Sequence, residues 1–178
     1  MIPIIPGFLI NLMTFPGVIF HELGHKWFCQ WTGVAVYEVC YFSLEASSFG
    51  GGYVIHEKPT KFYQVFFITL GPFITGTIIS LLVFVLCRLV ALANPRLTWL
   101  GLGLAWLGMS IAMQSFPSTV DANNLWEETD KRITKNPLAV IGYPFVLFIY
   151  IANLLSFLWF DLFYACILVW LVITFLPW

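Results

Sequence analysis

The five residues HELGH, His21 to His25, bring two imidazoles and one carboxylate together within a single helical turn. If this stretch is helical, His21 and His25 lie at positions i and i+4 on one face, where both can bind the same metal ion. Glu22 then stands beside the first histidine and can act as a base toward a water molecule at that ion. These residue types and this spacing predict a zinc site with His21 and His25 as ligands and Glu22 as the catalytic base.

The flanks of this motif are mostly apolar, which makes its polar residues costly. An ionised side chain near the middle of a membrane costs roughly 2.5–3.5 kcal/mol on insertion scales. Glu22 in such a setting therefore needs a cation or a water-filled cavity nearby. The alternative interpretation is that the three polar side chains mediate contacts between helices. Gly24, inside the motif, permits close packing and is compatible with both interpretations.

A hydrolytic zinc site normally has three protein ligands and one open position, so a third ligand must be sought. The extended pattern HExxHxxGxxH is absent, because Phe28 stands at its glycine position. The candidates are His56, Asp121 and Asp161. His56 would reach the site only if its segment dips inward, and Asp161 is expected at the opposite membrane face. Asp121 should reach the same depth as the two histidines, which favours it.

The composition predicts an all-α polytopic membrane protein. Of the 178 residues, 60% are hydrophobic and only 10% are charged, whereas soluble domains carry about a quarter charged residues. The net charge of −1 offers no basic surface for nucleic acid. We expect a single transmembrane domain over residues 1–178, with a core at 7–126 and a C-terminal helical hairpin at 137–178; HELGH in its first span is typical of zinc metalloproteases.

About five membrane-spanning helices are expected, since one span needs roughly 20 apolar residues. The candidate segments are residues 7–31, 62–93, 97–117 and two spans within 137–178 that are joined by a tight turn at 159–161. Gly71-Pro72 interrupts the second segment, so we expect a short entry segment and then a helix that begins at Pro72.

The distribution of lysine and arginine predicts the orientation in the membrane, because cytoplasmic loops carry an excess of positive charge. With the N-terminus outside, the larger group of basic residues falls on the cytoplasmic side, and the active site lies toward that side. This group is Lys26, Lys58, Lys61, Lys131, Arg132 and Lys135, against Arg88 and Arg96 on the outside.

Two short segments between the first two predicted spans are rich in β-branched and aromatic residues. Residues 34–42 and 52–57 predict a small interfacial β-hairpin with a glycine-containing loop. An edge strand of such a hairpin can hold an extended peptide by β-addition. We predict that the second strand, with glycines at 50–52 permitting movement, binds substrate; its residues are Gly52, Tyr53, Val54, Ile55 and His56. The alternative, which has equal weight, is that the hairpin only covers the site. For His56 itself, a structural role in the strand is favoured over contact with the substrate or the transition state.

The combination of these motifs resembles the site-2 protease family of intramembrane zinc metalloproteases. The matching elements are HELGH in the first span, Gly71-Pro72 in the second, and Pro117 with Val120-Asp121 after the third. The family typically has HExxH, a Gly-Pro element and a proline-containing stretch that ends in Leu-Asp-Gly. The resemblance covers roughly residues 15–126. Here Ala122 follows the aspartate, and Thr75 stands where the family frequently has asparagine.

The resemblance implies Zn²⁺ held by His21, His25 and Asp121, with Glu22 as the base. The substrate would be a transmembrane protein segment, cut within or near the lipid bilayer by a minimal member without a PDZ-like or other accessory domain. The alternative is a catalytically inactive zinc-binding membrane protein, such as a pseudoprotease or a metal-handling protein. Glu22 argues against that alternative, because a site that only binds metal needs no base beside its ligand.

Overall fold

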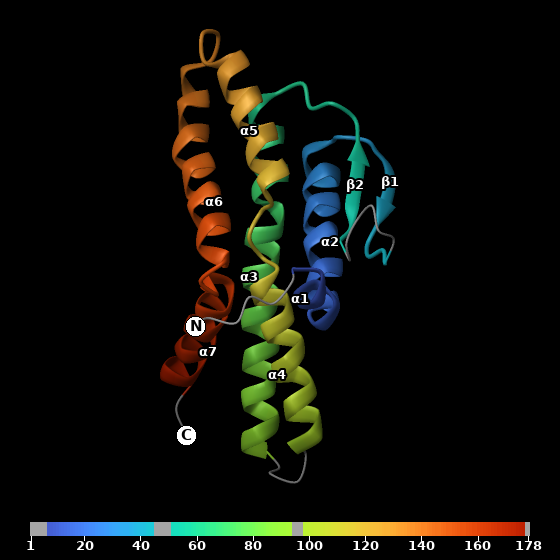
Figure 1. Cartoon of the computed structure of the whole chain (residues 1–178), viewed down its shortest axis with the longest axis vertical. Helices are drawn as coiled ribbons and strands as arrows, with labels where there is room; N and C mark the ends of the chain where they lie inside the picture. Colours follow the sequence, from blue (N-terminus) through green and yellow to red (C-terminus); the bar gives the residue numbers. More distant parts are fainter. Residues whose placement is uncertain (1–6, 45–50, 94–97, 177–178) are drawn as a thin grey trace.

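The computed structural model describes residues 7–44, 51–93 and 98–176 of the chain (Figure 1). These residues are mostly helical, with one small two-stranded antiparallel sheet, as the sequence predicted. In chain order the elements are α1 (Gly7–Met13), α2 (Phe15–Thr32), β1 (Val36–Cys40), β2 (Tyr53–His56), α3 (Phe62–Ala93), α4 (Thr98–Met113), α5 (Thr119–Arg132), the 3₁₀ helix η2 (Pro137–Ile141), α6 (Gly142–Ser156) and α7 (Phe160–Phe175).

Helix α3 is the central column of the molecule, and α2, α4, α5 and α7 pack against it (Figure 1). Small residues let α2 approach closely. A Cβ atom at Gly24 would lie 2.7 Å from the Cα atom of Pro72, and one at Gly17 would overlap the carbonyl of Ser110. Small residues at such positions allow helix backbones to come together. The helix that carries the histidine motif is therefore held directly against α3 and α4.

The segment predicted as the first span consists of two helices, α1 and α2. Thr14 separates them, and Pro16 stands in the first turn of α2, where a missing N–H is tolerated. Gly33 ends α2 in the left-handed conformation, with φ of 74°, and its N–H donates to the carbonyls of Cys29 and Gln30. HELGH therefore lies in the middle of a helix with defined ends.

Two pairs of consecutive helices each continue in one direction through the molecule, with an interruption between the two helices of the pair. Helix α4 and helix α5 point in one direction, with a break at residues 114–118, and α6 and α7 point in the opposite direction, with a break at 157–159 (Figure 1). Helix α6 packs beside α5, whereas α7 packs against α3 and α4. The prediction of a C-terminal helical hairpin over 137–178 is therefore wrong. The chain interrupts its helix at Trp159, where φ is 62°, but does not reverse direction.

Two of the described helical segments are long and apolar enough to cross a membrane, fewer than the five expected. They are α3 and the η2–α6 segment Pro137–Ser156. Helices α4 and α7 are apolar, but each has only 16 residues. Helix α2 is less apolar, because it carries the two histidines, Glu22 and Lys26. The pairs α1–α2, α4–α5 and α6–α7 are each interrupted part-way; the sequence predicted stops near Pro117 and at 159–161 but not the one at Thr14.

Helix α3 continues through Gly71-Pro72 without a break, so the predicted start of a helix at Pro72 is wrong.

The expected β-hairpin is present: β1 and β2 pair antiparallel, with Val36 opposite His56 and Cys40 opposite Tyr53. Strand β2 lies next to α2, and β1 is on its outer side (Figure 1). Of the glycines at 50–52, residue 50 lies outside the described residues.

Candidate metal centre

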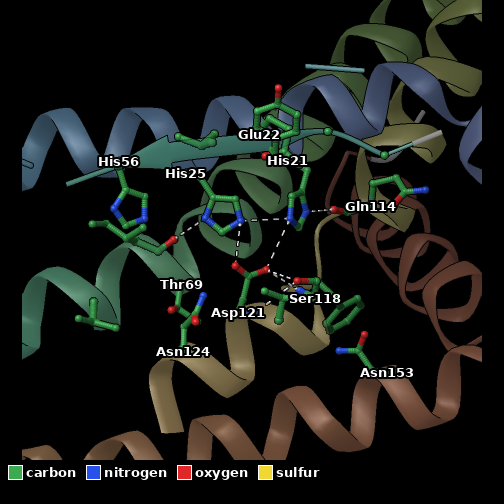
Figure 2. Close-up of a pocket in the computed structure, with 18 of the residues that line it drawn as sticks. His21, Glu22, His25, His56, Thr69, Gln114, Ser118, Asp121, Asn124 and Asn153 are labelled. Carbon is green, nitrogen blue, oxygen red and sulfur yellow. Dashed lines mark hydrogen bonds and ion pairs between the residues drawn. The ribbon is translucent and has the colours of Figure 1, made fainter. Parts of the chain in front are cut away.

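Three of the predicted site residues come together in the structure. The Nε2 atom of His25 lies 3.2 Å from Nε2 of His21 and 3.4 Å from Oδ1 of Asp121. Nε2 of His21 lies 3.9 Å from Oδ2 of Asp121. Figure 2 shows the two imidazoles and the carboxylate turned toward one another. Among the described residues, this is the one group of three His, Cys, Asp or Glu side chains with donor atoms close enough to hold a metal ion.

Asp121 reaches the histidines because α5 begins immediately before it. Ser118 caps α5: its hydroxyl oxygen accepts from the N–H of Asp121, and its own N–H donates to Oδ2 of Asp121 at 2.8 Å. The Ser118 hydroxyl also donates to Oδ2 at 2.6 Å. Oδ2 is therefore held by the cap, while Oδ1 faces His25. The helix α5 and its cap Ser118 were not predicted, although Ser-x-x-Asp is a sequence signal for a capping box.

The opposite end of α5 is tied to the connection between β2 and α3. Glu128 accepts from Arg132 at 2.9 Å, and Arg132 also donates to the carbonyl of Pro59 at 3.0 Å. Partial burial acts to raise the pKa of Glu128, but the hydrogen bond and charge of Arg132 outweigh it, with help from Lys58 and Lys131, so that the pKa is lowered. Helix α5 is thus fixed at both ends, which holds Asp121 in place.

Main-chain carbonyls orient both imidazoles. Nδ1 of His21 lies 2.8 Å from the carbonyl oxygen of Gln114, and Nδ1 of His25 lies 2.9 Å from that of Ile68. A carbonyl oxygen can only accept, so each Nδ1 carries the hydrogen and each neutral ring presents the lone pair of Nε2. Gln114 and Ile68 act through their backbones, which is why their residue types gave no signal in the sequence.

This set of donors fits zinc. Two imidazole nitrogens and one carboxylate oxygen are a ligand set of catalytic zinc sites, and a fourth position stays open toward a cavity. Donors bound about 2.0–2.1 Å from a tetrahedral ion lie about 3.3–3.4 Å apart. The separations of His25 from His21 and from Asp121, 3.2 and 3.4 Å, are close to this value. Each donor residue also has the hydrogen-bonded partner that ligands of zinc sites usually have.

The cluster lies on the wall of a cavity of about 950 Å³. Its lining comes from α2, β2, α3 and α5, and also from the junction of α6 and α7, where Asn153, Ser156 and Asp161 lie. The expectation that Asp161 lies far away, at the opposite membrane face, is wrong, because α7 begins half-way along the molecule. His56 lines the same cavity, but neither it nor Asp161 belongs to the cluster of donors.

The hairpin covers Glu22. The Glu22 side chain lines the cavity and is only 6% exposed. Gly52 lies against it: a Cβ atom at this position would come within 2.5 Å of both Cγ of Glu22 and the carbonyl oxygen of Cys40. Figure 2 shows β2 passing over the cluster, with His56 on its side of the cavity. The absence of a side chain at residue 52 is therefore what lets β2 pack directly on the candidate base.

Thr75 does not take part in the site. Its hydroxyl donates to the carbonyl of Gly71 at 2.7 Å and packs against Gly24 between α2 and α3.

The two asparagines of α5 differ in their placement. Asn124 lines the cavity, whereas Asn123 accepts a hydrogen bond from the hydroxyl of Tyr150 on α6. Asn124 is therefore the asparagine of α5 that faces the cavity.

Comparisons of the chain with protein-family models, with curated proteins and with solved structures found no match. A function therefore has to be argued from the donor cluster, the cavity and the hairpin themselves. The described geometry offers a metal ligand set, a nearby buried carboxylate and an open strand edge within one cavity.

Proposed function

We propose that the protein is a zinc metalloendopeptidase, similar to the site-2 proteases, that hydrolyses peptide bonds of transmembrane protein segments within or near the membrane. One observation carries the proposal: the donor atoms of His21, His25 and Asp121 converge on the wall of the cavity that Glu22 also lines. A site that only held two helices together would need neither the third donor on α5 nor the open space beside it.

The chain's own residues would perform the following steps. His21 and His25 would hold the metal through Nε2, and Asp121 would hold it through its carboxylate, whose charge would offset part of the ion's charge. Zinc, when bound, would supply Lewis-acid chemistry, making water more acidic and polarising the scissile carbonyl. Glu22 takes a proton from the attacking water and later passes it to the leaving amine nitrogen.

The outer surface supports a multi-pass position in the membrane. Large apolar side chains are exposed along the outward faces of several helices; examples are Leu82 at 63%, Trp99 at 86% and Leu154 at 74%. Contiguous apolar surface of this kind is rare on soluble monomers. Lys58 and Lys131 both approach Glu128, at one end of the molecule. That end would face the cytoplasm by the positive-inside rule, with the N-terminus outside.

The free edge of β2 supports substrate binding by strand addition. The N–H of Ser43 donates to the carbonyl of Gly51, and the N–H of Glu57 donates to that of Ala35. Backbone groups of successive strand residues point to alternate edges, so the odd-numbered residues of this segment pair with β1. The groups of Gly52, Val54 and His56 therefore point to the other edge, and the whole segment from Gly51 to Val54, with His56, lines the cavity. Only β1 and β2 form the described sheet.

Replacing Val54 with proline tests this role. Val54→Pro removes an outward-pointing N–H and leaves the pairing with β1 intact, so cleavage should fall at least about tenfold while zinc content stays unchanged. Val54→Ala, which keeps the N–H, is the control and should cleave at nearly the wild-type rate. Ile55→Pro removes an N–H that faces β1 and should also impair cleavage, by loosening the hairpin. Full activity of Val54→Pro would show that the hairpin is only a cover.

Metal removal tests the proposed function as a whole. The purified protein should contain about one zinc ion per chain and should cleave at least one member of a panel of single-span substrates. A chelator should abolish cleavage, and added Zn²⁺ should restore it, because the proposed mechanism needs a bound metal ion as its Lewis acid. Cleavage that persists without zinc would contradict the proposal. Zinc binding without any cleavage would favour an inactive zinc-binding membrane protein instead.

A further inference from the structure

The carbonyl that orients His25 belongs to Ile68 and has no hydrogen-bond donor within its own helix, α3. In an α-helix the carbonyl of residue i accepts from the N–H of residue i+4, which pairs Ile68 with position 72. Position 72 is proline, which has no N–H, although α3 continues through it. The oxygen of Ile68 is thus left without its helical donor, and it accepts from Nδ1 of His25 at 2.9 Å.

The carbonyl that orients His21 also has no helical donor, but for a different reason, because α4 ends at Met113. The carbonyl of Gln114 would pair with the N–H of Ser118 in an α-helix or with that of residue 117 in a 3₁₀ turn. The N–H of Ser118 donates to Asp121 instead, at 2.8 Å, and Pro117 has no N–H. The oxygen of Gln114 accepts from Nδ1 of His21 at 2.8 Å. Both histidines therefore use a carbonyl that its i+4 residue does not serve: Pro72 has no N–H, and the N–H of Ser118 donates to Asp121.

The packing of α2 makes the first of these contacts possible. Gly24 lies against Pro72, with space for no side chain between them. His25, the next residue, is 7% exposed, so water can replace the Ile68 carbonyl only at the cost of opening this interface. A buried imidazole without an acceptor for Nδ1–H can shift to the tautomer that carries its hydrogen on Nε2. That hydrogen would occupy the position where the metal is to bind.

We propose that Pro72 is a positioning residue of the metal centre. It withholds a backbone N–H from α3, and the carbonyl of Ile68 released in this way fixes His25 with Nε2 free for the metal. The consequence for zinc affinity rests on the proposed function, but the consequence for the tautomer does not, because it concerns the protein without metal.

Pro72→Ala tests the inference by restoring the N–H. The new donor should pair with Ile68 within α3, and His25 should lose its acceptor. Zinc affinity should then fall about 10–100-fold, as it does when outer partners of metal-bound histidines are removed. In the zinc-free protein, ¹⁵N NMR of labelled histidine should show Nδ1–H of His25 in the wild type and its loss in the variant. Alanine is the better helix former, so α3 should persist.

Two matched controls separate the missing N–H from the shape of the ring. Lactic acid placed at position 72 through an ester bond lacks the N–H, as proline does, and should keep the wild-type tautomer and affinity. Pro137→Ala changes the first residue of η2, which follows the extended residue Asn136 and has no preceding helical turn to receive its N–H, and should have no effect.

The inference is overturned if Pro72→Ala keeps both the His25 tautomer and the zinc affinity, or if the ester protein behaves like Pro72→Ala. Should Pro72→Ala fail to fold, the ester protein still decides, since loss of the Nδ1–H signal there contradicts the inference. A wild-type protein that binds no zinc would refute the proposed function and leave the tautomer measurement as the test of this inference.

Discussion

Glu22→Gln is expected to lower the rate of peptide-bond cleavage by about 10²–10⁴-fold, the usual contribution of a general base. Glutamine keeps the shape of the side chain beneath Gly52 but cannot take a proton from water. Glu22 is not one of the clustered donors, so the variant should bind zinc like the wild type. The measurement is the initial cleavage rate of a single-span substrate in detergent, with zinc content determined on the same sample.

Glu127→Gln is the matched control for this experiment. Glu127 also lines the cavity, but its side chain is 66% exposed and it pairs with Lys131. The same chemical change there should leave the cleavage rate close to that of the wild type. If Glu22→Gln cleaved at a similar rate to Glu127→Gln, Glu22 would be excluded as the base.

Asp121→Ala is expected to remove zinc and activity together. The loss in affinity should exceed the roughly 10–100-fold that follows removal of an outer partner, because here a ligand itself is lost. Alanine also removes the acceptor that completes the cap with Ser118, so α5 could start differently. Asp121→Asn separates the two effects: its amide oxygen can still accept from Ser118, but the ligand's charge is gone. Zinc content after dialysis against a weak chelator is the measurement.

The other two candidate ligands provide the controls for Asp121. Asp161→Ala and His56→Ala should both retain zinc, since neither residue belongs to the donor cluster, although both line the cavity. If Asp121→Ala kept full zinc occupancy while His56→Ala lost the metal, His56 would be the third ligand. The role assigned to the start of α5 would then be wrong.

The features that the sequence predicted correctly depend on local spacing or on one strong signal. HELGH lies on a helix, so its i, i+4 spacing brings the histidines together. Pro117 ends the helical pattern after α4, and the chain then brings Asp121 to the same depth. The β-branched and aromatic residues around Glu38 and Ile55 do form the hairpin. The helix and the hairpin follow from a few consecutive residues, whereas the depth of Asp121 followed from counting residues along the third span.

The features that were missed depend on contacts between distant segments. A helix stop near Trp159 can be read from the chain, but the direction of α7 follows from its packing against α3 and α4. A proline rule predicts a break at Pro72, yet α3 continues, because a side chain from another helix satisfies the carbonyl that Pro72 leaves open. Such a partner, 43 positions away in the chain, has no local signature.

The contact between Gly52 and Glu22 links recognition to chemistry mechanically. Because no space separates them, the candidate base can be no steadier than the strand that rests on it. A segment that joins the free edge of β2 would stiffen that strand and Glu22 with it. A transmembrane helix that cannot unwind could not join this edge. It would leave Glu22 loosely held and would therefore not be cleaved. In a membrane crowded with helices, the choice of substrate would then depend on how readily a segment loses its helical form, more than on its amino-acid sequence.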